Sequence, residues 1–341
     1  MNLLVTGGCG FIGSNFIRHV LANRPAVRVF NLDLLTYAGN MENLSDVEKD
    51  PRYAFFKGDI NDEKLVSAIL ADPGIDTIVN FAAESHVDRS IMGAAQFVKT
   101  NVQGVAVLLE AARGRGIGGE RFLQVSTDEV YGSLPLNSTD LFAETAPLHP
   151  NNPYAATKAA ADLLVLSYVR TFGMDAVITR SSNNYGPRQH PEKFIPLFIT
   201  NALEDKECPL YGNGENVRDW IYVRENCAGI LAALERGRRG EIYNLGGRSE
   251  QTNTHVARAI MELTGRTERL VRPIQDRPGH DLRYALDVTK ARRELLWAPV
   301  MSFDNGLKET VEWYRAHPEW VARAKSGEYQ QYFEKNYRGR S

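Results

Sequence analysis

The chain has 341 residues, 43% of them hydrophobic and 24% charged, and its 40 basic and 42 acidic side chains give a formal net charge of -2. This composition is typical of a globular protein and argues against a nucleic-acid or membrane-surface partner. No apolar run approaches the roughly 20 residues that span a bilayer, and the first residues leave no room for a cleavable leader. The three cysteines are odd in number and widely spaced, which favours a reduced, cytoplasmic compartment over a disulfide framework.

Short apolar runs alternate with helical patterns along the first half of the chain. The apolar runs cover residues 2–8, 27–33, 77–83, 121–127 and 175–187. The helical patterns cover residues 11–24, 64–70, 97–116 and 153–173. Strands that alternate with helices form right-handed crossovers and a parallel sheet covered on both faces. We therefore predict an α/β fold, with a Rossmann-type doubly wound parallel sheet and a smaller C-terminal α/β substrate-binding lobe.

A change in residue composition and element length marks the expected domain boundary. From about Pro187 onward, Pro, Gly and Asn are more frequent and the predicted elements are shorter. We predict a first domain of residues 1–186, to which the chain returns around 222–246 with a late helix and strand. Residues 187–341 are then mainly a second, substrate-binding domain.

A glycine-rich loop joins the first strand to the first helix. In VTGGCGFIGSNF, Gly7, Gly10 and Gly13 lie at this junction. Gly8, Gly10 and Gly13 also match the pattern G-x-G-x-x-G. Such glycines allow a tight turn and let backbone N–H groups approach a pyrophosphate at the helix N-terminus. Asp33 ends the next strand 20 residues after Gly13, where an acid hydrogen-bonds a ribose and repels a 2'-phosphate. The loop therefore predicts a dinucleotide site that prefers NAD to NADP.

Tyr154 and Lys158 stand four residues apart in NNPYAATKAAADLL, on one face of a predicted helix. A lysine ammonium beside a phenol is expected to lower the phenol's pKa from about 10, which makes the tyrosine a usable base. A strand that ends in Ser126 and Thr127 precedes this helix. With the glycine loop, the pattern resembles the extended short-chain dehydrogenase/reductase family, in which such a Tyr and Lys serve hydride transfer.

Two adjacent acids, Asp128 and Glu129, follow the same strand in STDEVYG. Burying acids at a strand end is costly unless they are paired or used. Neighbouring carboxylates repel each other, which keeps one of them protonated, so the two can divide into a general acid and a general base. The alternative is that one acid caps a turn and the other is solvated.

The resemblance narrows within that family to the dTDP-glucose 4,6-dehydratases and covers nearly the whole chain. The motifs that carry it are TGGCGFIGSNF, DLLTYAGN, GDI, NFAAESHVDRSI, STDEVYG, NPYAATKAAAD, SNNYGPRQHPEKFIPLFI, LYGNGENVRDWIYV and RPGHDLRYALD. It implies an NAD-dependent dehydration of dTDP-glucose to dTDP-4-keto-6-deoxyglucose. Carbon 4 would be oxidised transiently, water would leave across carbons 5 and 6, and the hydride would return to carbon 6.

The resemblance also implies the roles of the catalytic residues. Thr127 would hydrogen-bond the sugar's 4-hydroxyl, Asp128 would be the general acid and Glu129 the general base. Tyr154 would deprotonate the 4-hydroxyl, and Lys158 would orient the nicotinamide ribose and tune the tyrosine. No step calls for a metal ion.

Two binding sites follow from the same resemblance. NAD would be held by Gly7, Gly10, Phe11, Ile12, Gly13, Asp33, Leu34, Thr36, Asp59, Ile60, Ala82, Thr100, Tyr154 and Lys158. The nucleotide sugar would be held by Ser85, Asn183, Lys193, Arg218, Asn253, Arg277 and His280. Arg218 suits a diphosphate because a guanidinium binds such oxygens bidentately, and its alternative is a surface ion pair with Asp219 or Glu215.

Some residues have no assigned role or depart from the pattern. Glu84 and His86 stay undecided, although the absence of a cysteine or second histidine at ligand spacing favours a structural or substrate-edge role for His86. Arg188 replaces a common Tyr near the expected diphosphate end, Leu34 a common Lys, and Ala94 a common Pro.

Rival functions remain open at this point. A nucleotide-sugar 4-epimerase, or a UDP-sugar dehydratase or decarboxylase, would have the same fold, and only the acid pair favours dehydration of dTDP-glucose. A non-enzymatic dinucleotide-binding protein is a rival from another class. The helical segments 97–112 and 154–169 are apolar over more than one face, and related proteins pair these helices, so we expect a homodimer.

Overall fold

Seven parallel strands form the central sheet of the first lobe, in the order β10-β6-β5-β4-β1-β2-β3. The computed structural model describes residues 1–71, 74–114, 121–326 and 329. The strands are β1 (Asn2–Thr6), β2 (Arg28–Asp33), β3 (Tyr53–Lys57), β4 (Thr77–Asn80), β5 (Arg121–Thr127), β6 (Asp175–Ser181) and β10 (Ile242–Leu245). The predicted doubly wound parallel sheet is confirmed. β10 is the last strand to join it, after the chain has crossed the second lobe.

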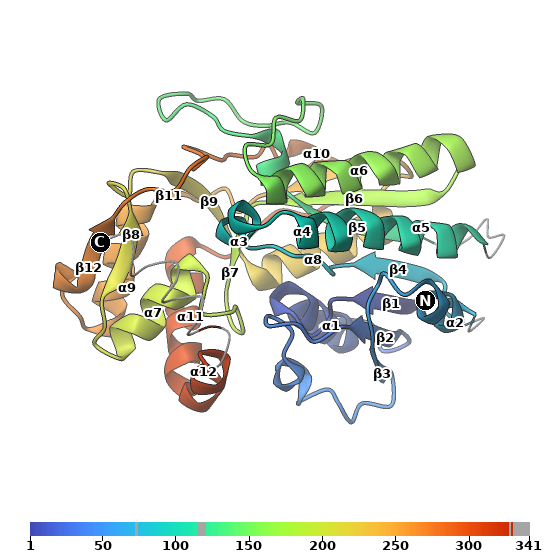
Figure 1. Ribbon diagram of the computed structural model, residues 1–341, viewed down its shortest axis with the longest axis horizontal. Coiled ribbons are helices and arrows are strands. Elements are labelled where there is room, and N and C mark those ends of the chain that lie inside the picture. The colour runs from blue at the N-terminus through green and yellow to red at the C-terminus, as the bar shows by residue number, and fades with distance from the viewer. Residues whose placement is uncertain (72–73, 115–120, 327–328, 330–341) are drawn as a thin grey trace.

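Helices cover both faces of this sheet (Figure 1). One face carries α1 (Phe11–Asn23), α8 (Val223–Arg236) and α10 (Thr289–Glu294), and the other carries α2 (Glu63–Leu70), α5 (Gly104–Gly114) and α6 (Pro153–Phe172). Alternate side chains of β1 enter the two cores, Leu3 and Val5 on the first face and Leu4 on the second. Since both faces are buried, the strands are continuous apolar runs rather than alternating ones.

The helix predicted over 97–116 contains a π-helical turn. It consists of α4 (Ala95–Val98), a π-helical turn η2 (Lys99–Gln103) and α5, and residues 115–116 lie outside the described part of the chain. Asn101 in the π turn is buried, accepts a hydrogen bond from Glu84 N at 2.8 Å and donates to Thr157 Oγ1 at 3.0 Å. Apolar periodicity does not reveal a π turn, which inserts one residue into a helix and frequently lies at a functional site.

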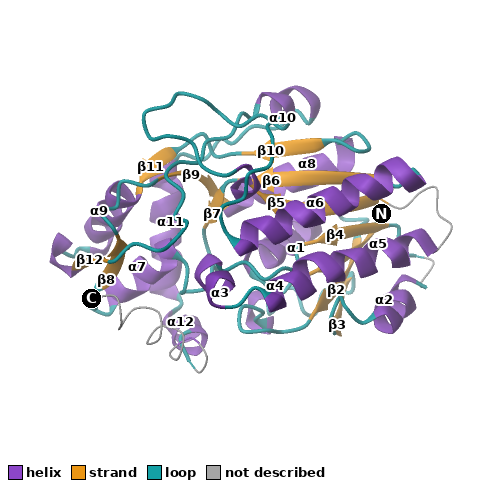
Figure 2. Cartoon of the chain, turned by 45° about the horizontal axis from the view of Figure 1, so that its top comes forward, coloured by secondary structure: helices purple, strands orange, loops and turns teal. Residues whose placement is uncertain are grey.

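The second lobe contains two small sheets and the remaining long helices (Figure 2). β7 (Asn183–Tyr185), β9 (Val217–Tyr222) and β11 (Glu250–Thr252) form one sheet, and β8 (Cys208–Tyr211) pairs with β12 (Val271–Ile274) in the other. The helices are α7 (Phe194–Leu203), α9 (Asn253–Thr264), α11 (Phe303–Ala316) and α12 (Pro318–Ala324). They share a core with residues of β7, β8 and β9.

Short helical segments lie in the connections: η1 (Met41–Leu44), α3 (Val87–Met92), η3 (Asp128–Tyr131) and η4 (Glu268–Leu270). Two of them, α3 and η3, follow the sheet strands β4 and β5, so they lie at the sheet's carboxyl edge. β7 begins two residues after β6 ends, and the second lobe therefore joins the sheet at the same edge. None of the helices in the described part of the chain combines the length and the apolar sequence needed to cross a bilayer.

Candidate active site

The glycine loop between β1 and α1 adopts a conformation that larger residues could not share. Gly7 has a φ of +70°, and a Cβ there would lie 2.6 Å from the backbone nitrogen of Ala82. A Cβ on Gly13 would lie 2.4 Å from the backbone oxygen of Gly7. Gly10 is the N-cap of α1 and brings no capping side chain. The loop therefore leaves the first N–H groups of α1 to interact with a ligand.

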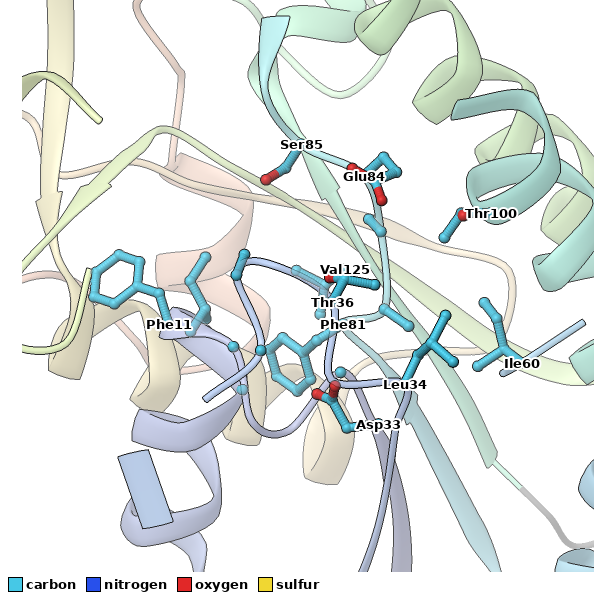
Figure 3. A pocket seen from close by; sticks show the side chains of 18 of the residues that line it. Phe11, Asp33, Leu34, Thr36, Ile60, Phe81, Glu84, Ser85, Thr100 and Val125 are labelled. Atoms are coloured by element: carbon cyan, nitrogen blue, oxygen red, sulfur yellow. The ribbon is translucent and has the colours of Figure 1, made fainter. Parts of the chain in front are cut away.

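A cavity of about 240 Å³ opens above this loop, and we call it the glycine-loop cavity (Figure 3). Every residue for which the sequence predicted contact with NAD lines its wall: Gly7, Gly10, Phe11, Ile12, Gly13, Asp33, Leu34, Thr36, Asp59, Ile60, Ala82, Thr100, Tyr154 and Lys158. The wall also includes Gly39, Phe81, Val125 and Ser126, which the sequence analysis did not assign to it. Phe81, Val125 and Ser126 lie at or just after the ends of β4 and β5, which was the available signal for them.

Asp33 ends β2 at the floor of the glycine-loop cavity. One carboxylate oxygen accepts the backbone N–H of Cys9 at 2.9 Å and the other accepts that of Leu35 at 2.8 Å. Burial raises the pKa of Asp33, and the two backbone N–H groups oppose that effect. The backbone N–H groups of Cys9, in the glycine loop, and of Leu35 thus fix the orientation of this carboxylate at the cavity.

A second cavity, of about 170 Å³, lies between the lobes, and we call it the interlobe cavity. Every residue predicted to hold the nucleotide sugar lines it: Ser85, Asn183, Lys193, Arg218, Asn253, Arg277 and His280. Ser85, Gln189, Glu192 and Lys193 line both cavities, so the two adjoin. Lys193 Nζ donates to the carbonyl of Ser85 at 2.7 Å and thereby links the second lobe to the first at their junction.

Arg218 is not part of a surface ion pair. Its side chain is buried, and its guanidinium donates to the carbonyls of Val217 and Asp281, both at 2.8 Å. Arg188, expected near the diphosphate, lines neither cavity. It has a φ of +71° and lies over the ring of Trp313 at 5.5 Å.

The acid pair lies in η3, directly after β5. Thr127 is the N-cap of this turn, since its Oγ1 accepts the N–H of Glu129 at 3.3 Å. Glu129 lines the interlobe cavity and accepts a hydrogen bond from Asn152 Nδ2 at 3.2 Å. Thr127 and Asp128 are buried and line neither cavity, and Asp128 is only 2% exposed. The structure thus brings Glu129 to the cavity surface and buries Asp128 beside it.

The two acids differ in their surroundings. Burial, and next the adjacent Glu129 carboxylate, raise the pKa of Asp128 well above its ordinary value. Burial also raises the pKa of Glu129, but the Arg277 guanidinium and the Asn152 hydrogen bond oppose the rise. Asp128 is therefore the better proton donor and Glu129 the better acceptor.

Tyr154 and Lys158 lie one turn apart on α6, whose N-cap Asn152 accepts the N–H of Ala155 at 2.9 Å. Both side chains are buried and line the glycine-loop cavity. Lys158 Nζ donates to the carbonyl of Val125 at 2.7 Å, and burial lowers the pKa of Lys158 to about 8.

The expected lowering of the pKa of Tyr154 by Lys158 is wrong for this structure. Burial, followed by the negative charge of Glu129, raises the pKa of Tyr154, and a hydrogen bond with Thr127 only partly opposes this. The Lys158 ammonium is bonded to the Val125 carbonyl, and desolvation disfavours the charged phenolate. His86 is also buried, and burial with the nearby Lys193 lowers its pKa well below the ordinary value, so His86 is neutral.

The chain resembles known proteins over almost its full length. Residues 4–310 match the family model described as GDP-mannose 4,6 dehydratase. It is 46% identical to the dTDP-glucose 4,6-dehydratase of Shigella flexneri, with 100% of both chains covered. The crystal structure of the dTDP-glucose 4,6-dehydratase from Streptomyces venezuelae, with NAD bound, is 51% identical at a TM-score of 0.91 and covers 95% of this chain and 100% of its own.

More distant structures share the fold with another activity. The UDP-glucose 4-epimerase of Thermotoga maritima, solved with UDP-glucose, is 32% identical at a TM-score of 0.84 and covers 93% of this chain and 100% of its own. The greater identity to the dehydratases confirms the resemblance that the motifs indicated. The chain belongs to the GDP-mannose 4,6 dehydratase family.

Proposed function

We propose that this protein is an NAD-dependent hydro-lyase that converts dTDP-glucose to dTDP-4-keto-6-deoxyglucose. The observation that carries the proposal is the acid pair Asp128 and Glu129, held in one turn close to Tyr154, with Glu129 in the wall of the interlobe cavity. Oxidation or epimerisation at carbon 4 needs no such pair. The identity of the chain to curated dTDP-glucose 4,6-dehydratases supports the same function.

The glycine-loop cavity fits NAD in shape and in donor chemistry. Neighbouring backbone atoms leave no room for a side chain at Gly7 or Gly13, so the loop can meet a ligand only with its backbone. Helix α1 begins at this loop with free N–H groups. Asp33 has a carboxylate at the place where a ribose would bind and a 2'-phosphate would be repelled. NAD bound there would supply the hydride acceptor at carbon 4 and the hydride donor at carbon 6.

Three residues prepare the sugar for elimination. Tyr154 takes the proton of the 4-hydroxyl, which Thr127 holds by a hydrogen bond. Lys158, fixed by the Val125 carbonyl, would orient the nicotinamide ribose and stabilises the tyrosinate that accepts this proton. The resulting 4-keto group makes the carbon-5 proton acidic enough to be removed.

The acid pair performs the elimination. Glu129 removes the carbon-5 proton, because it reaches the interlobe cavity and its charge is supported by Arg277. Asp128, which stays protonated because of burial and of Glu129, gives its proton to the departing 6-hydroxyl. The electron pair of the carbon-5–hydrogen bond forms the double bond as the carbon-6–oxygen bond breaks, and one water leaves.

The decisive experiment is incubation of the purified protein with dTDP-glucose in heavy water, followed by NMR of the product. Proton exchange at Glu129 should place deuterium at carbon 5 of a 4-keto-6-deoxy sugar. A galactose-configured product would identify a 4-epimerase and refute the dehydratase. Competition between dTDP-glucose and UDP-glucose for the same protein decides the nucleotide.

The remaining features of the proposal concern organisation. Residues 1–186 and the returning segment 222–246 would form the NAD-binding domain, and residues 187–341 mainly the nucleotide-sugar domain. We also propose a homodimer that pairs α5 and α6, which lie side by side in Figures 1 and 2 and leave Leu163 57% exposed. Cysteines 9, 208 and 227 are free thiols, which supports a location in the cytoplasm.

A further inference from the structure

Asp88 joins the two lobes at the interlobe cavity. It lies in α3, which follows the sheet strand β4, and its side chain is only 3% exposed. Its Oδ1 lies 3.1 Å from Nη1 of Arg277, and its Oδ2 accepts the hydroxyl of Tyr211 at 2.9 Å. Tyr211 ends β8 and Arg277 lies three residues after β12, so both partners belong to the second lobe. All three residues line the interlobe cavity.

The contact is a buried charge pair and differs in kind from the exposed pairs elsewhere on the molecule. Burial acts to raise the pKa of Asp88, but the Arg277 guanidinium, His86 and Tyr211 lower it to about 2, so the carboxylate is ionised at neutral pH. Exposed ion pairs contribute little because water screens them. The Asp88 carboxylate is 3% exposed and the Arg277 side chain 18%, so water screens this pair little, and loss of one partner leaves a poorly compensated charge.

The pairing leaves part of Arg277 available to a ligand. Asp88 occupies Nη1, whereas Nε is buried and has no hydrogen-bond acceptor among the residues that the structure describes. Arg277 lines the interlobe cavity with 18% of its side chain exposed, and a guanidinium there suits phosphate oxygens. The same guanidinium lowers the pKa of Glu129, so Arg277 is close to the proposed base as well.

We propose that Asp88 is a positioning residue for the nucleoside diphosphate of the substrate. It acts through Arg277 and Tyr211 to hold the second-lobe wall of the interlobe cavity against α3, with the Arg277 guanidinium kept at the cavity wall for the diphosphate. This inference rests on the proposed function, since it takes the ligand of the interlobe cavity to be a nucleotide sugar. Arg277 contacts the ligand, and Asp88 sets where that contact is made.

Two other roles for Asp88 make different predictions. If its charge merely weakened the attraction of Arg277 for phosphate, any neutral replacement would tighten nucleotide binding. If Asp88 only stabilised the fold, its removal would lower the melting temperature without a specific effect on nucleotide affinity. A positioning role requires an acceptor at residue 88 and requires Arg277.

The experiment compares Asp88→Ala with Asp88→Asn in the NAD-loaded protein. Calorimetry gives the Kd for thymidine diphosphate, and steady-state assays give KM and kcat for dTDP-glucose. We expect Asp88→Ala to raise both Kd and KM by about 10–100-fold, as for loss of one partner of a buried charge pair. Asp88→Asn keeps an oxygen for Nη1 and should restore both constants to within about threefold.

A double-mutant cycle with Arg277→Lys tests whether Asp88 acts through that residue. In the Arg277→Lys background, Asp88→Ala should change the Kd by less than about twofold, because the two residues act as one unit. Glu250→Ala is the matched control. Glu250 pairs with buried Arg283 at 2.6 Å but lines neither cavity, so nucleotide affinity should not change.

Several outcomes would overturn the inference. These are unchanged or tighter nucleotide binding in Asp88→Ala, no recovery in Asp88→Asn, or additive effects in the cycle. Should Asp88→Ala fail to fold, Asp88→Ser, whose hydroxyl is too short to reach both partners, serves for the same comparison. If wild type binds thymidine diphosphate but does not turn over dTDP-glucose, the proposed function fails, and the calorimetric comparison still decides the role of Asp88.

Discussion

Replacement of Glu129 by glutamine separates the elimination from the steps that precede it. The Glu129 side chain lines the interlobe cavity and accepts a hydrogen bond from Asn152 at 3.2 Å. Glutamine has the same length, and its amide oxygen can keep that bond, so the substitution removes the base and preserves the shape. We expect dehydration to slow by about 10²–10⁴-fold, the usual contribution of a positioned general base.

The structure also predicts the effect of this substitution on the neighbouring groups. The negative charge of Glu129 is one of the causes that raise the pKa of Tyr154 and that of Asp128. Its removal lowers both pKa values, so Tyr154 gives up its proton more readily and oxidation at carbon 4 continues. The variant should therefore accumulate reduced nicotinamide when it is mixed with dTDP-glucose.

Rapid-mixing absorbance measures the reduced nicotinamide, and NMR of the quenched mixture measures the 6-deoxy product. Glu215→Gln is the control, because Glu215 is exposed, lines neither cavity and should turn over at the wild-type rate. If Glu129→Gln kept more than a tenth of the dehydration rate, Glu129 would not be the base. If reduced nicotinamide disappeared together with dehydration, the separation of the two half-reactions would be wrong.

Three further predictions follow from the geometry. Gly13→Ala places a methyl group 2.4 Å from the backbone oxygen of Gly7, so the purified protein should contain less NAD and unfold about 1–3 kcal/mol more easily, as measured by cofactor content and urea denaturation. Asp162 forms a 2.9 Å ion pair with Arg180, which is only 2% exposed. Asp162→Ala leaves that buried guanidinium without its carboxylate and should lower the free energy of unfolding by about 3–5 kcal/mol. A change below about 1 kcal/mol would show that water reaches the pair. Burial lowers the pKa of Lys158 to about 8, so its ammonium is present below that pH and lost above it. The rate of carbon-4 oxidation should therefore decline above about pH 8. If Lys158→Arg showed the same decline, another group would be responsible for it.

The fold could be predicted from the sequence because its signals are local. An apolar run followed by glycines and a helical pattern is sufficient to indicate a strand, a turn and a helix in that order. The π turn at Lys99–Gln103 within the predicted helix could not be predicted in this way. The hydrogen bonds of Asn101 to Glu84 and Thr157 accompany that π turn, and they depend on segments brought together by the sheet and α6.

Part of the candidate site could also be predicted from local signals in the sequence. Tyr154 and Lys158 share a helix face because they are four residues apart, and Asp128 and Glu129 follow the strand that ends in Thr127. Local spacing therefore determined the chemical groups of the proposed reaction.

Only the tertiary structure decided how those groups are placed and charged. The sequence does not show that Asp88 meets Arg277 and Tyr211, which lie 189 and 123 residues further along the chain. The sequence also did not predict that burial raises the pKa of Tyr154. Contacts between lobes and desolvation depend on the packing of distant segments, whereas strand ends, glycine turns and helix faces depend on neighbours in the chain.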